Sequence, residues 1–133
     1  MKNKNLIDSF KHAFEGFKTC VYKERNIKIH LCVMFLVILF GIILEISKYE
    51  IISCLILFGL VIGAELFNTA IEIVVDMITL KTDINAKNAK DIAAGSVLVL
   101  AIFSFIVGLI IFVPKIIVFI KEILWKKKIL ISY

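Results

Sequence analysis

The sequence predicts an all-α membrane protein that has an N-terminal amphipathic surface helix and three transmembrane helices. Of its 133 residues, 61% are hydrophobic and the mean hydropathy is +1.00, whereas soluble chains are about 45–50% apolar. The apolar residues form long runs, as membrane spans require. One Pro and six Gly leave little turn material for a barrel of alternating strands. The composition excludes a soluble domain and a disordered chain, and no nucleic-acid partner is expected.

Residues 5–26 have the pattern of an amphipathic helix, with the lysines largely on the side away from the apolar residues. The apolar side chains recur every three or four residues, at Leu6, Phe10, Phe14, Phe17 and Val21. This pattern predicts a helix on the membrane surface, which serves either as an anchor alone or with its end as part of an active site. No apolar stretch of the signal-peptide kind occurs here, so no cleavable signal is expected.

Three apolar runs are each long enough for a helix of about 20 residues that crosses the membrane. They predict spans at about residues 31–46, 51–80 and 92–113, with short polar segments between them. Pro114 follows the third span and is expected to end its helix. Residues 116–133 then form a basic, amphipathic C-terminal tail.

Lysine and arginine residues place the N-terminus in the cytoplasm. Seven of them precede the first span, whereas the first loop has only Lys48. The basic tail does not suit this pattern, because three spans put it on the outer side. Either the early segments dominate the orientation, or residues 116–125 return to the membrane interface.

The isolated cysteines and histidines indicate neither a zinc site nor a disulfide framework. The three cysteines, Cys20, Cys32 and Cys54, are odd in number and lack CxxC spacing, so we interpret them as small packing residues. His30, at the start of the first span, is interpreted as an interfacial or hydrogen-bonded residue.

A stripe of polar residues, three of them acidic, lies on the second predicted span, where charged side chains are energetically unfavourable. Burying one charge in hydrocarbon costs at least about 2.5 kcal/mol on insertion scales. The stripe consists of Glu65, Asn68, Glu72 and Asp76, which fall within roughly 80° of one another on a helix. It is either a polar seam between helices or a site in which a cation separates the carboxylates. A hard divalent cation such as Mg²⁺ prefers oxygen ligands and retains phosphate oxygens, which makes a metal-nucleotide the natural occupant.

Two charged clusters at the same predicted interface could complete such a site. Residues 23–26 include Glu24, which can supply another carboxylate to a metal, and residues 89–91 include Lys90, which can meet a phosphate. Their alternatives are snorkelling anchors and an ordinary helix start. Gly59 and Gly63 form a GxxxG motif, which indicates close helix packing and an oligomer. No GxxxxGK[ST] phosphate loop occurs in the sequence.

At these residues the sequence resembles the small prokaryotic membrane lipid kinases, the diacylglycerol kinase and undecaprenol kinase family. The segment from Gly63 to Asp76 resembles the family signature on its second membrane helix. Glu24-Arg-Asn with His30, and Ala89-Lys-Asp91 followed by Ala-Ala-Gly-Ser, resemble the other two blocks in order and spacing. The resemblance covers about residues 9–114 and makes residues 1–115 the membrane lipid kinase domain.

The resemblance implies a homotrimer in the bacterial cell membrane, with ATP sites at the cytoplasmic interface. It assigns Glu65 as the catalytic general base, and Glu24 and Glu72 as ligands of Mg²⁺ and the nucleotide. The other nucleotide-binding positions that it implies are His12, Asn68, Asp76, Lys81, Asp83, Lys90 and Asp91. Relatives often have different residues at His12 and at 81–83.

The function expected from these residues is transfer of the γ-phosphate of MgATP to the hydroxyl of a membrane lipid. Such a transfer requires mainly positioning and charge neutralisation. Undecaprenol is favoured as the lipid, with diacylglycerol as the alternative. Two other classes stay open: a small proton-coupled transporter that uses Glu65 as its proton carrier, and a non-enzymatic assembly subunit.

Overall fold

The computed structural model describes residues 5–79 and 83–131, in which the chain forms four helices and no strand. They are α1 (Leu6–Lys23), α2 (Arg25–Ile43), α3 (Lys48–Ile78) and α4 (Ile84–Ile131). Within this part of the chain, α2, α3 and α4 are long and apolar enough to cross a membrane. The predicted all-α fold class is therefore confirmed.

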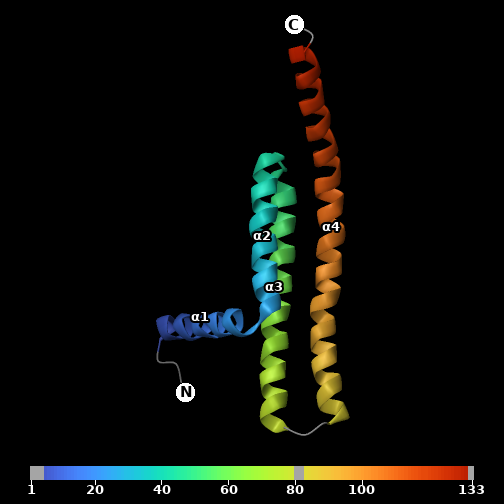
Figure 1. The fold of residues 1–133 in the computed structure, drawn as a ribbon. Helices are drawn as coiled ribbons and strands as arrows, with labels where there is room; N and C mark the ends of the chain where they lie inside the picture. The colour runs from blue at the N-terminus through green and yellow to red at the C-terminus, as the bar shows by residue number, and fades with distance from the viewer. Residues whose placement is uncertain (1–4, 80–82, 132–133) are drawn as a thin grey trace.

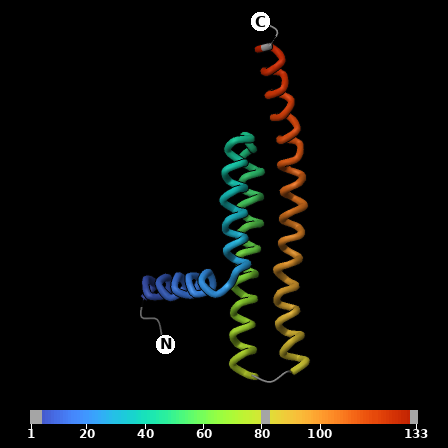
Figure 2. Tube along the Cα trace, in the orientation of Figure 1, coloured from blue at the N-terminus to red at the C-terminus, as the bar shows by residue number. Residues whose placement is uncertain are grey.

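α3 is the central helix and contacts the other three. α2 and α4 run lengthwise along the bundle, whereas α1 lies crosswise to it (Figure 1). The Cα trace shows that α1 meets the bundle partway along α3, so that one part of α3 extends beyond α1 (Figure 2). The polar residues of the second predicted span lie around this meeting point.

α1 begins and ends at positions that its side chains and backbone determine. Its first turn is capped by Asn5, whose Oδ1 accepts a hydrogen bond from the backbone N–H of Asp8 at 2.9 Å. Glu24 has extended backbone angles (φ −101°, ψ 128°), and this break separates α1 from α2. Cys20 and Ile27 flank the break and are buried against Ile62 of α3. This apolar junction holds α1 against the bundle and places Glu24 beside α3.

The turn between α2 and α3 contains the backbone hydrogen bonds of a Schellman motif. Ile46 N–H donates to the carbonyl of Gly41 at 3.1 Å and Glu45 N–H to that of Ile42 at 3.3 Å, while Glu45 has a φ of 50°. Glycine is the usual residue at such a left-handed position. Ser47 then caps α3 in a capping box with Glu50. These two motifs make a compact hairpin of α2 and α3.

The prediction that Pro114 ends the third membrane helix is wrong, because α4 continues through Pro114 to Ile131. Proline removes one N–H donor from the helix and its ring crowds the carbonyl of residue 110. Val113 precedes Pro114 and Lys115 follows it, and residues 115–131 contain no further proline and no glycine, so the helix loses little backbone hydrogen bonding at Pro114 and continues beyond it. Residues 116–131 therefore extend α4 as a helix.

Two contacts define two levels along the bundle. Cys20 of α1 contacts Thr69 of α3 on what we call the α1 face, and Lys115 of α4 pairs with Glu50 on the hairpin face. Thr69 lies 19 residues after Glu50 on α3, a distance of about 29 Å along the axis. This distance is close to the hydrocarbon thickness of about 30 Å. A membrane that covers the bundle between these levels would leave the end of α3 and the start of α4 outside it on the α1 face.

The GxxxG motif does not serve as a close contact within one chain. A methyl group at Gly59 or Gly63 would meet no side chain of the described residues within 4 Å. The predicted close packing at this motif therefore requires a second copy of the chain or another protein.

Candidate functional site

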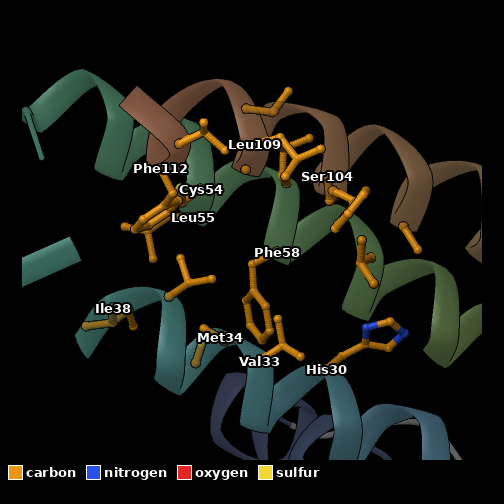
Figure 3. A pocket seen from close by; sticks show the side chains of 18 of the residues that line it. His30, Val33, Met34, Ile38, Cys54, Leu55, Phe58, Ser104, Leu109 and Phe112 are labelled. Atoms are coloured by element: carbon orange, nitrogen blue, oxygen red, sulfur yellow. The ribbon is translucent and has the colours of Figure 1, made fainter. Parts of the chain in front are cut away.

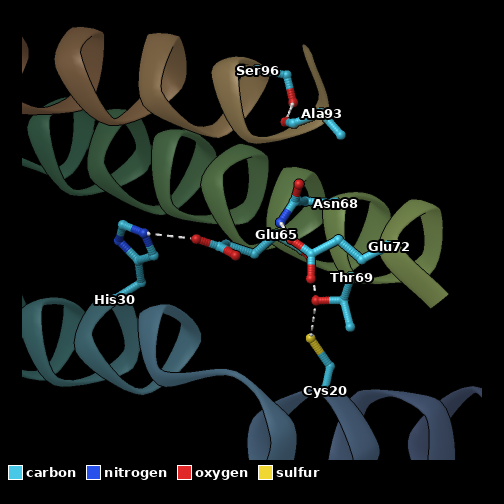
Figure 4. A network of polar contacts seen from close by, with 8 residues as sticks. All are labelled: Cys20, His30, Glu65, Asn68, Thr69, Glu72, Ala93 and Ser96. Atoms are coloured by element: carbon cyan, nitrogen blue, oxygen red, sulfur yellow. Dashed lines mark hydrogen bonds and ion pairs between the residues drawn. The ribbon is translucent and has the colours of Figure 1, made fainter. Parts of the chain in front are cut away.

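Glu65 lies at the centre of the candidate site, where α3 passes the junction with α1 and α2. Its side chain is only 2% exposed, and its Oε1 lies 3.4 Å from Nε2 of His30 on α2 (Figure 4). Water has almost no access to this carboxylate, so the imidazole of His30 is the polar group that it contacts in place of water. α2 and α3 together therefore position an acid that can exchange a proton.

Thr69 and Cys20 secure α1 beneath this acid. The hydroxyl of Thr69 lies 3.0 Å from the carbonyl oxygen of Glu65 and 3.1 Å from the thiol of Cys20 (Figure 4). Both side chains are buried. The contact ties the end of α1 to the turn of α3 that carries Glu65.

Asn68 and Glu72 continue the polar face of α3 toward its exposed end. Asn68 Nδ2 donates a hydrogen bond to Oε1 of Glu72 at 3.2 Å. Asn68 Oδ1 is buried and has no hydrogen-bond partner among the described residues. A buried oxygen of this kind calls for a donor or a cation. The stripe is thus brought together in the order in which the sequence predicts it.

Two further carboxylates, those of Glu24 and Glu72, lie close enough for their charges to act on Glu65. Together with the free oxygen of Asn68, they are hard oxygen donors of the kind that Mg²⁺ prefers. No group of three His, Cys, Asp or Glu residues in the described part of the chain is arranged to hold a metal ion by itself. A cation bound by these donors would therefore keep water or phosphate oxygens among its ligands.

Asp76 and Lys90 connect α3 to α4 near the projecting end of the bundle. Lys90 Nζ lies 2.5 Å from Oδ1 of Asp76. The ion pair holds an ammonium group on the side of α3 that carries the stripe, and Asp91 is exposed on the following position. These three residues lie where the last turns of α3 meet the first turns of α4.

Two of the remaining predicted nucleotide contacts, His12 and Asp83, are not brought to Glu65. His12 is exposed on α1, pairs with Glu15 at 3.4 Å, and lies about 12 Å along the helix from Cys20. Asp83 caps α4, since its Oδ1 accepts hydrogen bonds from the backbone N–H groups of residues 85 and 86 at 2.8 and 2.9 Å. Lys81 lies outside the described residues.

An apolar cavity of about 460 Å³ lies between α2, α3 and α4 and ends at His30. Figure 3 shows Met34, Phe58 and Leu109 along its wall, with the His30 ring at one end. The wall is apolar apart from His30, Cys54 and Ser104. His30, at this end of the cavity, contacts Glu65, which does not itself line the cavity.

Sequence reasoning did not connect His30 to Glu65, which lies 35 positions later in the chain. The signal that could have linked them is their position relative to the apolar runs. His30 directly precedes the first run and Glu65 directly follows the apolar part of the second, so both lie at the α1 face of the bundle. Cys20 was correctly interpreted as a packing residue, but its contact with Thr69 has no local sequence signature. Such pairs arise only when separate helices pack.

The chain is similar in sequence to known proteins of one family. Residues 11–112 match the protein family described as prokaryotic diacylglycerol kinase. The chain is 44% identical over 107 residues to an undecaprenol kinase of Bacillus subtilis, covering 80% of this chain and 87% of that relative. It is 37% identical over 105 residues to a diacylglycerol kinase of Synechocystis sp., covering 78% of this chain but only 60% of that longer protein.

Proposed function

The chain belongs to the prokaryotic diacylglycerol kinase family and is an ATP-dependent lipid kinase; on this premise we propose that it phosphorylates undecaprenol. The family membership favours a kinase over the transporter and the assembly subunit. The relative from Bacillus subtilis carries the name undecaprenol kinase. The family description and the relative from Synechocystis support diacylglycerol as the second candidate substrate.

One observation carries the assignment of the site. Glu65 is a buried carboxylate in contact with His30, and His30 lies at one end of an apolar cavity between the helices. A lipid chain in that cavity would have its hydroxyl beside His30, next to the carboxylate. This arrangement suits an alcohol that cannot leave the bilayer.

The reaction is a direct transfer in which Glu65 is the general base. The hydroxyl oxygen of the lipid attacks the γ-phosphorus, the bond from that phosphorus to the β–γ bridging oxygen breaks, and ADP leaves. The hydroxyl proton passes to the carboxylate of Glu65. His30, 3.4 Å away, holds that carboxylate in place.

The nucleotide is held on the projecting end of α3 and α4. Glu24, Glu72 and the oxygen of Asn68 would hold Mg²⁺, which supplies charge neutralisation for the phosphates. Lys90, kept near the stripe by Asp76, adds a positive charge toward the transferred group. His12, Lys81, Asp83 and Asp91 complete the proposed nucleotide contacts.

The protein acts as a homotrimer in the bacterial cell membrane, with its N-terminus and site on the cytoplasmic side. The open surface at Gly59 and Gly63 supports association. The excess of lysine and arginine before α2 supports the orientation. ATP is then available at the α1 face.

Phosphate transfer from γ-labelled ATP, measured side by side on undecaprenol and diacylglycerol in mixed micelles with Mg²⁺, tests the proposal. We expect more label in undecaprenol, and a loss of about 10²- to 10⁴-fold in Glu65→Gln with ATP binding retained. Glu50→Gln is the matched control, because Glu50 lies on the same helix at the hairpin face and Gln also serves a capping box. An active Glu65→Gln enzyme would refute the role of Glu65, and preferential labelling of diacylglycerol would refute the choice of lipid.

A further inference from the structure

The C-terminal part of α4 is rich in large apolar side chains, and these are exposed in the part of the chain that the structure describes. α4 extends well past the hairpin of α2 and α3 (Figure 1). Its 48 residues span about 72 Å, whereas a bilayer with its headgroups is about 40–45 Å thick. The large apolar side chains from Ile116 to Leu130 are between 39% and 79% exposed. The match to the family ends at residue 112, so the kinase site does not account for this segment.

The segment is amphipathic when residues 116–130 are placed around a helix. One sector of roughly 160° contains a single lysine, Lys127, among apolar residues. These apolar residues are Ile116, Ile117, Phe119, Ile120, Ile123, Leu124 and Leu130. The other side contains Lys121, Glu122, Lys126 and Lys128 together with Val118, Trp125 and Ile129. Residues 116–130 contain four lysines and one glutamate, and this excess of positive charge is complementary to an anionic surface.

Pro114 gives the segment a hinge at the right level and in the right direction. It precedes Lys115, which pairs with Glu50 at the hairpin face, so it lies at the membrane boundary. The proline ring crowds the carbonyl of residue 110 and opens the helix on its own side. Pro114 lies about 160° around the helix from Ile116, so the bend is directed toward the sector of Ile116 and Ile123. Bending at Pro114 therefore turns the apolar sector toward the membrane.

We propose that residues 116–130 lie along the headgroup layer of anionic lipids on the hairpin face of the membrane. The apolar sector enters the lipid, the lysines meet the acidic headgroups, and Trp125 lies at the interface, as aromatic residues do in membrane proteins. This anchor is on the side of the membrane opposite to the kinase site. It fixes the position of α4 without contacting the reacting groups.

Trp125 is the only tryptophan of the chain and reports directly on the segment. The full-length protein is placed in vesicles of phosphatidylcholine, with and without phosphatidylglycerol, and its emission is quenched either by iodide or by brominated lipids. In anionic vesicles we expect blue-shifted emission, protection from iodide and quenching by bromines close to the headgroups. The ratio of headgroup-bound to water-exposed segment should fall about fivefold for each of Lys126, Lys127 and Lys128 changed to Gln.

Pro114→Ala tests the hinge. We expect this variant to retain lipid kinase activity while Trp125 loses its quenching by headgroup bromines. Iodide-accessible, red-shifted emission in anionic vesicles would overturn the proposal. Protection that is the same in both lipid mixtures, and that brominated lipids do not quench, would also overturn it, because another protein surface would then cover the segment.

Discussion

Replacing His30 with leucine should slow phosphoryl transfer without preventing folding. His30 lies 3.4 Å from Glu65, whose side chain is 2% exposed, so water cannot take the place of the lost imidazole. A hydrogen bond to a charged group is worth about 1.5–3 kcal/mol. If Glu65 needs that contact in the transition state, kcat should fall by about 10- to 150-fold.

The assay is steady-state transfer of labelled phosphate, with KM for ATP and for the lipid determined separately. We expect the loss mainly in kcat, because the contact positions the base and does not touch the nucleotide. His30→Gln, which keeps an N–H donor, should recover part of the rate. An unchanged kcat in His30→Leu would refute the argument, and an equal loss in both variants would show that the ring acts by packing alone.

Three further changes test the hairpin and the ion pair. Gly41→Ala should destabilise the protein by about 1 kcal/mol, measured by thermal unfolding in detergent, because the added methyl would meet Ile46 Cδ1 at 2.8 Å; an unchanged midpoint would contradict this. Glu45→Gly should raise the same midpoint by relieving the left-handed backbone at φ 50°, a gain of about 1 kcal/mol, and a lower midpoint would count against it. Lys90→Met should raise KM for ATP several-fold while costing at most about 1 kcal/mol of stability, since solvent screens its ion pair with Asp76; a large stability loss with unchanged KM would oppose that role.

The number of membrane helices and the polar stripe could be predicted from the sequence because both depend on local periodicity. Apolar runs of about 20 residues identify spans, and the spacing of Glu65, Asn68 and Glu72 places them on one side of any helix. The helix ends were given only by the structure. Arg25 begins α2 directly after Glu24, ahead of the membrane span predicted from about residue 31, because polar residues can extend a helix beyond the hydrocarbon.

The path of α4 through Pro114 was not evident from the proline itself. A proline alone favours a helix end, but residues 115–131 contain no further proline and no glycine, and a helix can continue past one proline with a local kink. Pro114 therefore disfavours the helix locally, but the residues around it keep α4 continuous to Ile131.

The sequence by itself determined the class of the protein, the number of spans and the family blocks that mark it as a lipid kinase. Only the tertiary structure decided that His30 lies beside Glu65, that Cys20 reaches Thr69, and that an apolar cavity ends at His30. The physical reason is that periodicity acts within one helix. Contacts between helices depend on how whole side-chain surfaces fit together when α1, α2 and α4 pack around α3.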